Sequence, residues 1–271
     1  MSEMKIAMVE DLYFRIPRSV WYSFFNSPYT PHRNAAAIDV YFPGEDALYP
    51  LEEGVLREIK KINTPHNIED YLLLFETHGL LLKVLHVKPS IKIGEKISNG
   101  ESFGRIIYSG YLYPWSNKHA HFEIRRMSDP YRARGGLKLK PLIQPLTPIA
   151  IGREYMVMEK QEYYIWVKPL ETNGRGLTPL YYNTSPIEGG IPHYNYGAVF
   201  GEVEELELMS CKIRVGERLM NNIGLFDTSN LAVKVNGENI KGVGVYCNQP
   251  YLKLITSGFE EGEVVELNIL C

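Results

Sequence analysis

The chain has 271 residues, 45% of them hydrophobic and 23% charged, which is enough to bury the core of one large domain or two ordinary ones. The net charge of −3 and the lack of a long basic run argue against nucleic acid as a partner. No signal peptide is recognised, and no run of about 18 apolar residues suggests a membrane span, so we expect a cytoplasmic protein without a membrane partner.

Short apolar runs bounded by glycine, proline and asparagine, together with 19 tyrosines, predict a mainly β chain. Residues 5–9 predict a first strand. Residues 38–42 predict another, with Asp39 and Tyr41 on one face and apolar side chains on the other. Asp39 is unusual in this position, because aspartate disfavours strands. It is either a strand-edge residue that makes a turn hydrogen bond or a functional carboxylate, and His32 precedes it in a loop-like segment.

The next elements are short strands with tight connections. Residues 71–75 and 80–87 predict two strands joined by a hairpin tip at residues 76–79. His86 lies near the end of the second strand, where a histidine is more often a hydrogen-bonded core residue than a catalyst. Residues 88–107 predict very short strands with glycine-rich turns, which are typical of small β-barrels and sandwiches.

The sequence His119-Ala120-His121-Phe122-Glu123-Ile124-Arg125 predicts a strand with two unlike faces. Residues i and i+2 of a strand share a face, so His119, His121 and Glu123 line one side and apolar residues line the other. Imidazole is a common zinc ligand and also an acid or base near pH 7. The aromatic segment 108–118 leads into this strand and either walls a pocket or packs on the surface.

Taken in order, these motifs resemble the lysostaphin/LytM-type zinc endopeptidases over about residues 28–142. The opening His32-Arg33 and the ending Ala37-Ile38-Asp39 are similar to an archaeal-like branch of that family. The resemblance rests further on these motifs: Glu53-Gly54-Val55, Leu85-His86-Val87, Ile93-Gly94-Glu95-Lys96-Ile97, Gly100, Phe103-Gly104, the His119–Arg125 strand and Asp129-Pro130-Tyr131.

The resemblance implies a LytM-like antiparallel β domain with small-barrel-like hairpins and one Zn²⁺ ion per chain. It implies that His32, Asp39 and His121 hold the zinc. It also implies that His86 and His119 act on the water and the reacting carbonyl of a peptide or related amide substrate. Such a ligand set leaves a coordination position open, which is typical of catalytic zinc.

The first metal ligand departs from that family's pattern. A histidine usually lies four residues before the aspartate, where this chain has Ala35, whereas His32 lies seven residues before Asp39. If His32 does not reach the metal, the centre is incomplete, and the chain is a non-catalytic binding or scaffold module on the same fold. The lack of a recognised signal peptide favours this alternative, because the best-known members of that family cut cell-wall peptides outside the cell.

The second half of the chain begins after a proline-rich segment. Three prolines at residues 141–148 indicate a connector, which predicts a metallopeptidase-like domain at 1–145 and a β-sandwich-like accessory domain at 150–271. The glycine- and tyrosine-rich segment 189–197 is either a lid, with His193 reaching substrate or metal, or an Ω-loop with its own packing.

Other features of the sequence receive plain interpretations. Asn236-Gly237 predicts a hairpin turn, and Cys211, Cys247 and Cys271 are expected to be free thiols because they form no C-x-x-C pair. His66 and His78 are expected to be solvated. The aromatic richness leaves a carbohydrate- or peptide-binding protein as a third hypothesis. The oligomeric state is not indicated.

Overall fold

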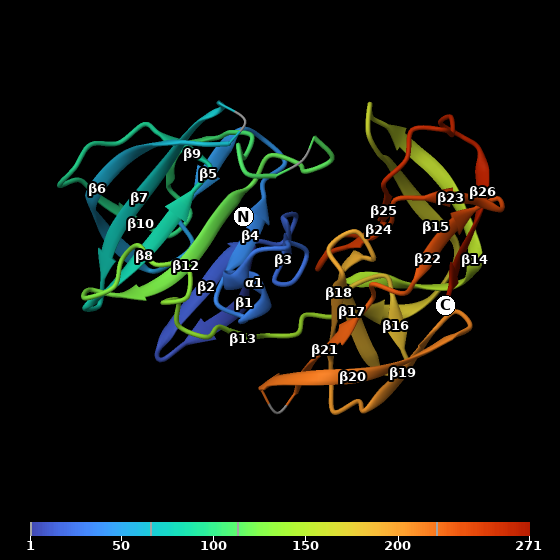
Figure 1. The fold of residues 1–271 in the computed structure, drawn as a ribbon. Coiled ribbons are helices and arrows are strands. Elements are labelled where there is room, and N and C mark those ends of the chain that lie inside the picture. The colour runs from blue at the N-terminus through green and yellow to red at the C-terminus, as the bar shows by residue number, and fades with distance from the viewer. Residues whose placement is uncertain (1, 66, 113, 221) are drawn as a thin grey trace. The chain divides into compact units, whose positions relative to one another are not determined.

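The computed structural model describes residues 2–65, 67–112, 114–220 and 222–271, and these are nearly all strands and turns. The prediction of a mainly β, two-domain protein is confirmed (Figure 1). Unit 1 comprises Met1–Tyr22 and Tyr29–Ile143, and unit 2 comprises Ser23–Pro28 and Gln144–Cys271. None of the helices formed by the described residues is long and apolar enough to cross a membrane.

Unit 1 contains a short helix, α1, and most of the strands of the first half of the chain. Its elements are β1 (Glu3–Val9), β2 (Leu12–Pro17), β3 (Trp21–Ser23), α1 (Thr30–Arg33), β4 (Ile38–Tyr41), β5 (Asp46–Leu48), β6 (Glu53–Asn63), β7 (Glu69–Thr77), β8 (Leu80–Leu85), β9 (Val87–Pro89), β10 (Lys96–Ser98), β11 (Ser102–Ile106), β12 (Ala120–Arg126) and β13 (Lys140–Pro141).

The largest sheet of unit 1 has the strand order β10-β6-β7-β8-β12-β4-β3. Strand β12 therefore lies between β8 and β4, and it pairs with both in antiparallel register. Two three-stranded sheets accompany it, with the orders β13-β1-β2 and β5-β11-β9. The predicted hairpin tip is confirmed, since β7 and β8 are joined by His78-Gly79, both with positive φ, as a tight two-residue hairpin turn requires.

An aromatic core joins the three sheets of unit 1. Phe75 on β7 lies between Tyr49 and Phe103, with ring centroids 5.2 and 5.3 Å away. Phe103 on β11 contacts Phe122 on β12, which in turn contacts Phe14 on β2. All five side chains are fully buried. The apolar face of β12 is thus fixed in the core, as its alternating sequence predicts.

Unit 2 is formed by the strands of the second half of the chain. These are β14 (Thr147–Lys160), β15 (Ile165–Gly176), β16 (Tyr181–Tyr182), β17 (Ser185–Ile191), β18 (Tyr196–Phe200), β19 (Glu205–Leu208), β20 (Cys211–Met220), β21 (Ile223–Asp227), β22 (Ala232–Val235), β23 (Glu238–Ile240), β24 (Val243–Val245), β25 (Leu252–Leu254) and β26 (Val264–Leu270). All of them except β16, which pairs with β17, join in one continuous path from β19 to β23. The hairpin turn at Asn236-Gly237 is confirmed between β22 and β23.

The short segment Ser23–Pro28 belongs to unit 2 although it lies early in the sequence. The buried carboxylate of Glu188 on β17 accepts hydrogen bonds from the backbone N–H groups of Phe24 and Phe25, at 2.7 and 3.1 Å. The hydroxyl of Tyr196 donates to the carbonyl of Ser27 at 2.6 Å. The sequence carries no periodic signal for such an anchor, because it depends on a partner more than 160 residues away.

Two local predictions are wrong. Segment 189–197 is not a loop, because Gly189 to Ile191 continue β17 and Tyr196 begins β18, which pairs with it. His193 lies in the turn between these strands. His86 is not in a strand either, since β8 ends at Leu85 and the chain bends there. The reason is that the backbone N–H of His86 donates a hydrogen bond to the side chain of Asp70 and not to a neighbouring strand.

The aromatic core predicts the stability of unit 1. Phe75→Ala removes a fully buried ring, so we expect it to lower the free energy of unfolding by about 3–5 kcal/mol. The measurement is chemical denaturation, with Ile93→Ala as the control because the Ile93 side chain is 60% exposed. The control should change the free energy of unfolding by less than about 0.5 kcal/mol. Equal effects of the two variants would contradict this core.

Candidate metal centre

Strand register brings Asp39 and His121 together. Residue His121 of β12 lies directly opposite Asp39 of β4 in the antiparallel pair. Directly opposed side chains share a face and lie about 5 Å apart at Cβ, so their polar ends meet. The Nδ1 atom of His121 lies 2.8 Å from Oδ1 of Asp39. Both residues are buried, because the polar face of β12 is covered as well as its apolar face.

His32 reaches the same point from helix α1. Pro31 lies in the first turn of this helix, and the chain leaves it through Ala35, whose φ of 54° is in the left-handed region. Residues 35–37 are buried alanines, whose small side chains let the backbone turn back towards β4. The Nε2 atom of His32 consequently lies 3.3 Å from both Oδ1 of Asp39 and Nδ1 of His121. The seven-residue spacing between His32 and Asp39 therefore does not prevent their contact.

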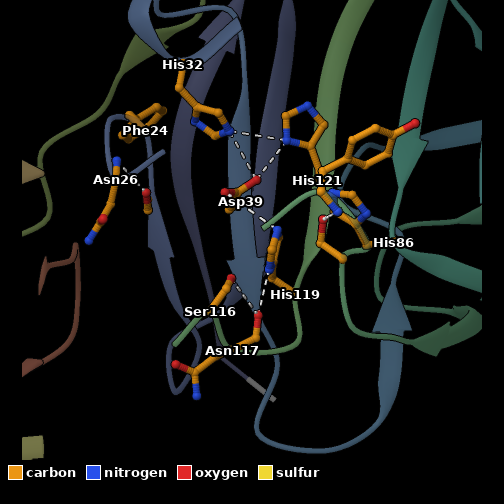
Figure 2. Close-up of polar contacts among 12 residues, drawn as sticks. Phe24, Asn26, His32, Asp39, His86, Ser116, Asn117, His119 and His121 are labelled. Carbon is orange, nitrogen blue, oxygen red and sulfur yellow. Dashed lines mark hydrogen bonds and ion pairs between the residues drawn. The ribbon is translucent and has the colours of Figure 1, made fainter. Parts of the chain in front are cut away.

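The three atoms have the spacing of metal ligands (Figure 2). A tetrahedral zinc site with bonds of about 2.0–2.1 Å places its ligand atoms ~3.3–3.4 Å apart. Two of the three separations here are 3.3 Å and the third is 2.8 Å. Among the residues that the structure describes, His32, Asp39 and His121 form the group whose donor atoms all lie within 4.8 Å of one another. They are a potential His/Asp metal site.

A second layer of charged residues orients His121. Its Nε2 lies 3.1 Å from Oε1 of Glu123, which also accepts a hydrogen bond from Lys83 at 2.7 Å. The other oxygen of Glu123 accepts from the fully buried Arg125, also at 2.7 Å. A carboxylate that accepts from one imidazole nitrogen leaves the other nitrogen to the metal. Glu123 thereby leaves Nδ1 as the nitrogen of His121 that could hold a metal.

Burial and opposite charges compete in this cluster. Burial raises the pKa of Asp39, but His32, His119 and His121 outweigh it and hold the pKa well below its ordinary value. Burial also raises the pKa of Glu123, yet hydrogen bonding to His121 and the nearby charges lower it to about 2. Burial alone would lower the pKa of His121, whereas Asp39 and Glu123 raise it to about 9. Without a metal, His121 is therefore the cation that the two carboxylates share.

His119 and His86 lie beside this group. His119 precedes β12, its Nδ1–H donates to the carbonyl of Asn117 at 2.8 Å, and its Nε2 lies 3.7 Å from Oδ2 of Asp39. Burial lowers the pKa of His119 to about 4, although Asp39 opposes this, so the ring is neutral at pH 7. The ring of His86 lies 5.0 Å from that of His119 and 6.0 Å from that of His121. The structure thus brings all five predicted site residues into one neighbourhood.

Sequence reasoning missed the partner of His86. The Nδ1–H of His86 donates to Oδ2 of Asp70 at 2.6 Å, and Asp70 is fully buried on β7. An aspartate within a predicted strand was the signal that singled out Asp39. Asp70 lies one residue before the predicted strand 71–75, and only the longer β7 of the structure includes it. Of the two histidines expected to be solvated, His78 is exposed in its hairpin turn, and His66 lies outside the described residues.

The comparisons with known proteins identify a family for both halves of the chain. The model of the N-terminal domain of DUF8155, a domain of unknown function, matches residues 12–141, and the model of its C-terminal domain matches residues 147–270. The chain belongs to the DUF8155 family. No curated protein and no solved structure matches this DUF8155 chain.

Membership of DUF8155 corrects the predicted relationship. The lysostaphin/LytM-type resemblance is wrong, because the family models that match residues 12–141 and 147–270 describe a different family. The motifs behind the resemblance were short: one H-x-H pair, one aspartate on a strand and a series of glycine turns. Each of these is what antiparallel strands and tight corners produce generally, and the departure at Ala35 was the residue that did not fit.

The raised pKa of His121 predicts proton release on metal binding. His121 of the DUF8155 protein is protonated below about pH 9, and a metal must displace the proton on Nδ1. Zinc affinity should therefore rise about tenfold per pH unit between pH 6 and 8, with about one proton released per ion. Calorimetry in buffers of different ionisation enthalpy measures this number. If zinc binds without proton release, His121 is not a metal ligand that is protonated in the free protein.

The hydrogen bond from His121 to Glu123 predicts a second effect. Glu123→Gln keeps the shape of the side chain but removes the charge that orients His121, so zinc affinity should fall about 10–100-fold. Competition with a chromophoric chelator measures this. The control is Glu76→Gln, which removes a strand carboxylate that pairs with Arg57 instead. If both variants bind zinc like the parent protein, Glu123 does not support the ligand.

Proposed function

We propose that this DUF8155 protein is a zinc-dependent hydrolase, with His32, Asp39 and His121 as the metal ligands. The observation that carries the proposal is the separation of 3.3, 3.3 and 2.8 Å among their three donor atoms. Two imidazoles and one carboxylate suit zinc, although other divalent ions accept the same donors. Three protein ligands leave a fourth position for water, which is typical of catalytic sites.

A zinc ion in such a site lowers the pKa of a bound water to about 7 and polarises a carbonyl group. The protein must then accept a proton from the water and return one to the leaving amine. His86 and His119 have the right chemistry for these steps. Each ring donates its Nδ1–H away from the cluster, to Asp70 and to the carbonyl of Asn117, and so keeps Nε2 for exchange with substrate and water.

The proposed substrate is a peptide or a related amide, whose hydrolysis needs both an activated water and a proton for the departing nitrogen. The alternative is a non-catalytic binding or scaffold module. That alternative requires an incomplete metal centre, and the contact of His32 with Asp39 and His121 supports the enzyme instead. One experiment that measures both metal content and hydrolysis distinguishes the two functions.

Elemental mass spectrometry of tag-free protein should give about one zinc per chain, and His32→Ala and His121→Ala should lose it. The control is His78→Ala, whose exposed side chain lies in the β7–β8 turn and should not affect the metal. His119→Ala should keep the zinc and lose cleavage of a peptide library by about 10²-fold or more. Absence of metal after zinc is offered would support the binding module, whereas full loading without any hydrolysis would exclude the proposed hydrolase.

A further inference from the structure

His86 has a backbone conformation that needs an explanation. Its φ is 65°, in the left-handed region, between the end of β8 at Leu85 and the start of β9 at Val87. This conformation is strained for a residue other than glycine. Surrounding contacts must impose it, and such imposed positions cluster at functional sites.

Asp70 supplies these contacts with both of its carboxylate oxygens. Oδ1 accepts hydrogen bonds from the backbone N–H of His86 at 3.0 Å and from that of Tyr71 at 2.7 Å. Oδ2 accepts from Nδ1 of the His86 ring at 2.6 Å. Both side chains are buried, so water does not compete for these bonds. The carboxylate therefore fixes the backbone, the ring orientation and the tautomer of His86 together.

We infer that Asp70 is the positioning residue that makes His86, rather than His119, the base of the proposed hydrolase. This inference rests on the function proposed above. The Asp70 carboxylate holds the proton of His86 on Nδ1 and leaves a lone pair on Nε2. When Nε2 accepts a proton, the buried negative charge beside it stabilises the resulting imidazolium, as the aspartate of a Ser-His-Asp triad does.

His119 differs in the partner of its Nδ1–H. That proton is donated to the backbone carbonyl of Asn117, which fixes the same tautomer but carries no negative charge. His119 can accept a hydrogen bond at Nε2, yet its Nδ1 partner does not stabilise a cation as a carboxylate does. The two histidines thus share a tautomer and differ in the charge behind them.

His86 takes a proton from the attacking water and later gives it to the leaving amine. An O–H bond of the water breaks, its proton moves to Nε2 of His86, and its oxygen forms a bond to the carbonyl carbon while the π electrons move to the carbonyl oxygen. The electron pair on the carbonyl oxygen then re-forms the C=O bond as the C–N bond breaks, and the Nε2 proton of His86 passes to the leaving nitrogen, which returns His86 to its neutral form.

Asp70→Asn tests the positioning role because of how an amide must sit in this place. Its single oxygen is needed for the backbone N–H groups of His86 and Tyr71, so its NH₂ group faces Nδ1 of His86. The His86 proton then moves to Nε2, where it blocks proton uptake. Zinc-loaded full-length protein labelled with ¹⁵N-histidine reports the tautomer, and the spectrum of His86→Gln assigns the signals.

We expect an Nδ1–H tautomer with a strongly downfield proton in the parent protein and an Nε2–H tautomer in Asp70→Asn. The control is Glu69→Gln, the neighbouring residue on β7, whose exposed side chain pairs with Lys61 and should leave His86 unchanged. With the peptide that the parent cleaves best in the library, kcat should fall about 10²-fold or more in Asp70→Asn, with zinc content and KM nearly unchanged.

Several outcomes would overturn the inference. An Nε2–H tautomer in the parent protein does so without any variant, even if Asp70→Asn fails to fold. An unchanged tautomer, an unchanged kcat, or loss of zinc together with activity in a folded Asp70→Asn protein also does so. A zinc-loaded parent that cleaves no peptide overturns the proposed function and this inference with it, whereas an active Asp70→Asn protein overturns only the role of Asp70.

Discussion

The buried carboxylate of Asp39 is the constraint on which the centre of unit 1 depends. An ionised carboxylate without solvent is strongly destabilising unless opposite charge and hydrogen bonds surround it. Asp39 has the imidazoles of His32, His119 and His121 around it, and these hold its pKa well below the ordinary value. In the absence of a metal, a protonated His121 supplies the opposite charge. A divalent cation in the same place would take over that role and release the proton.

The charges extend from Asp39 along the polar face of β12. His121 lies between Asp39 and Glu123, and Glu123 in turn lies between Lys83 and Arg125. Cations and anions therefore alternate through a part of the sheet that excludes water. Removing one member leaves its neighbour as an uncompensated buried charge, which is far more destabilising than replacing the whole set by apolar residues. The face has the composition of a site and is poorly suited to a core that serves stability alone.

Sequence alone predicted the elements whose information is local. Alternation at 119–125 placed His121 and Glu123 on one face of β12, and the hairpin turns at 76–79 and Asn236-Gly237 follow from their residues. It did not predict the bend at His86, because this depends on a hydrogen bond to Asp70 on β7. The docking of Ser23–Pro28 on Glu188 is equally non-local. The family assignment failed for a related reason, since short motifs record local geometry and not ancestry.

Backbone strain is present at two positions beside the same site. Ala35 and His86 both have φ in the left-handed region, at 54° and 65°, although neither is glycine. The first ends the turn that returns the chain from His32 to Asp39, and the second orients the imidazole held by Asp70. The strained backbone at each position costs free energy compared with a relaxed loop. In return it holds an imidazole, that of His32 or that of His86, in a defined direction at the buried cluster. A preorganised centre must hold its groups in position before substrate or metal arrives. The strained backbone at these two positions and the charged side chains between them meet that requirement.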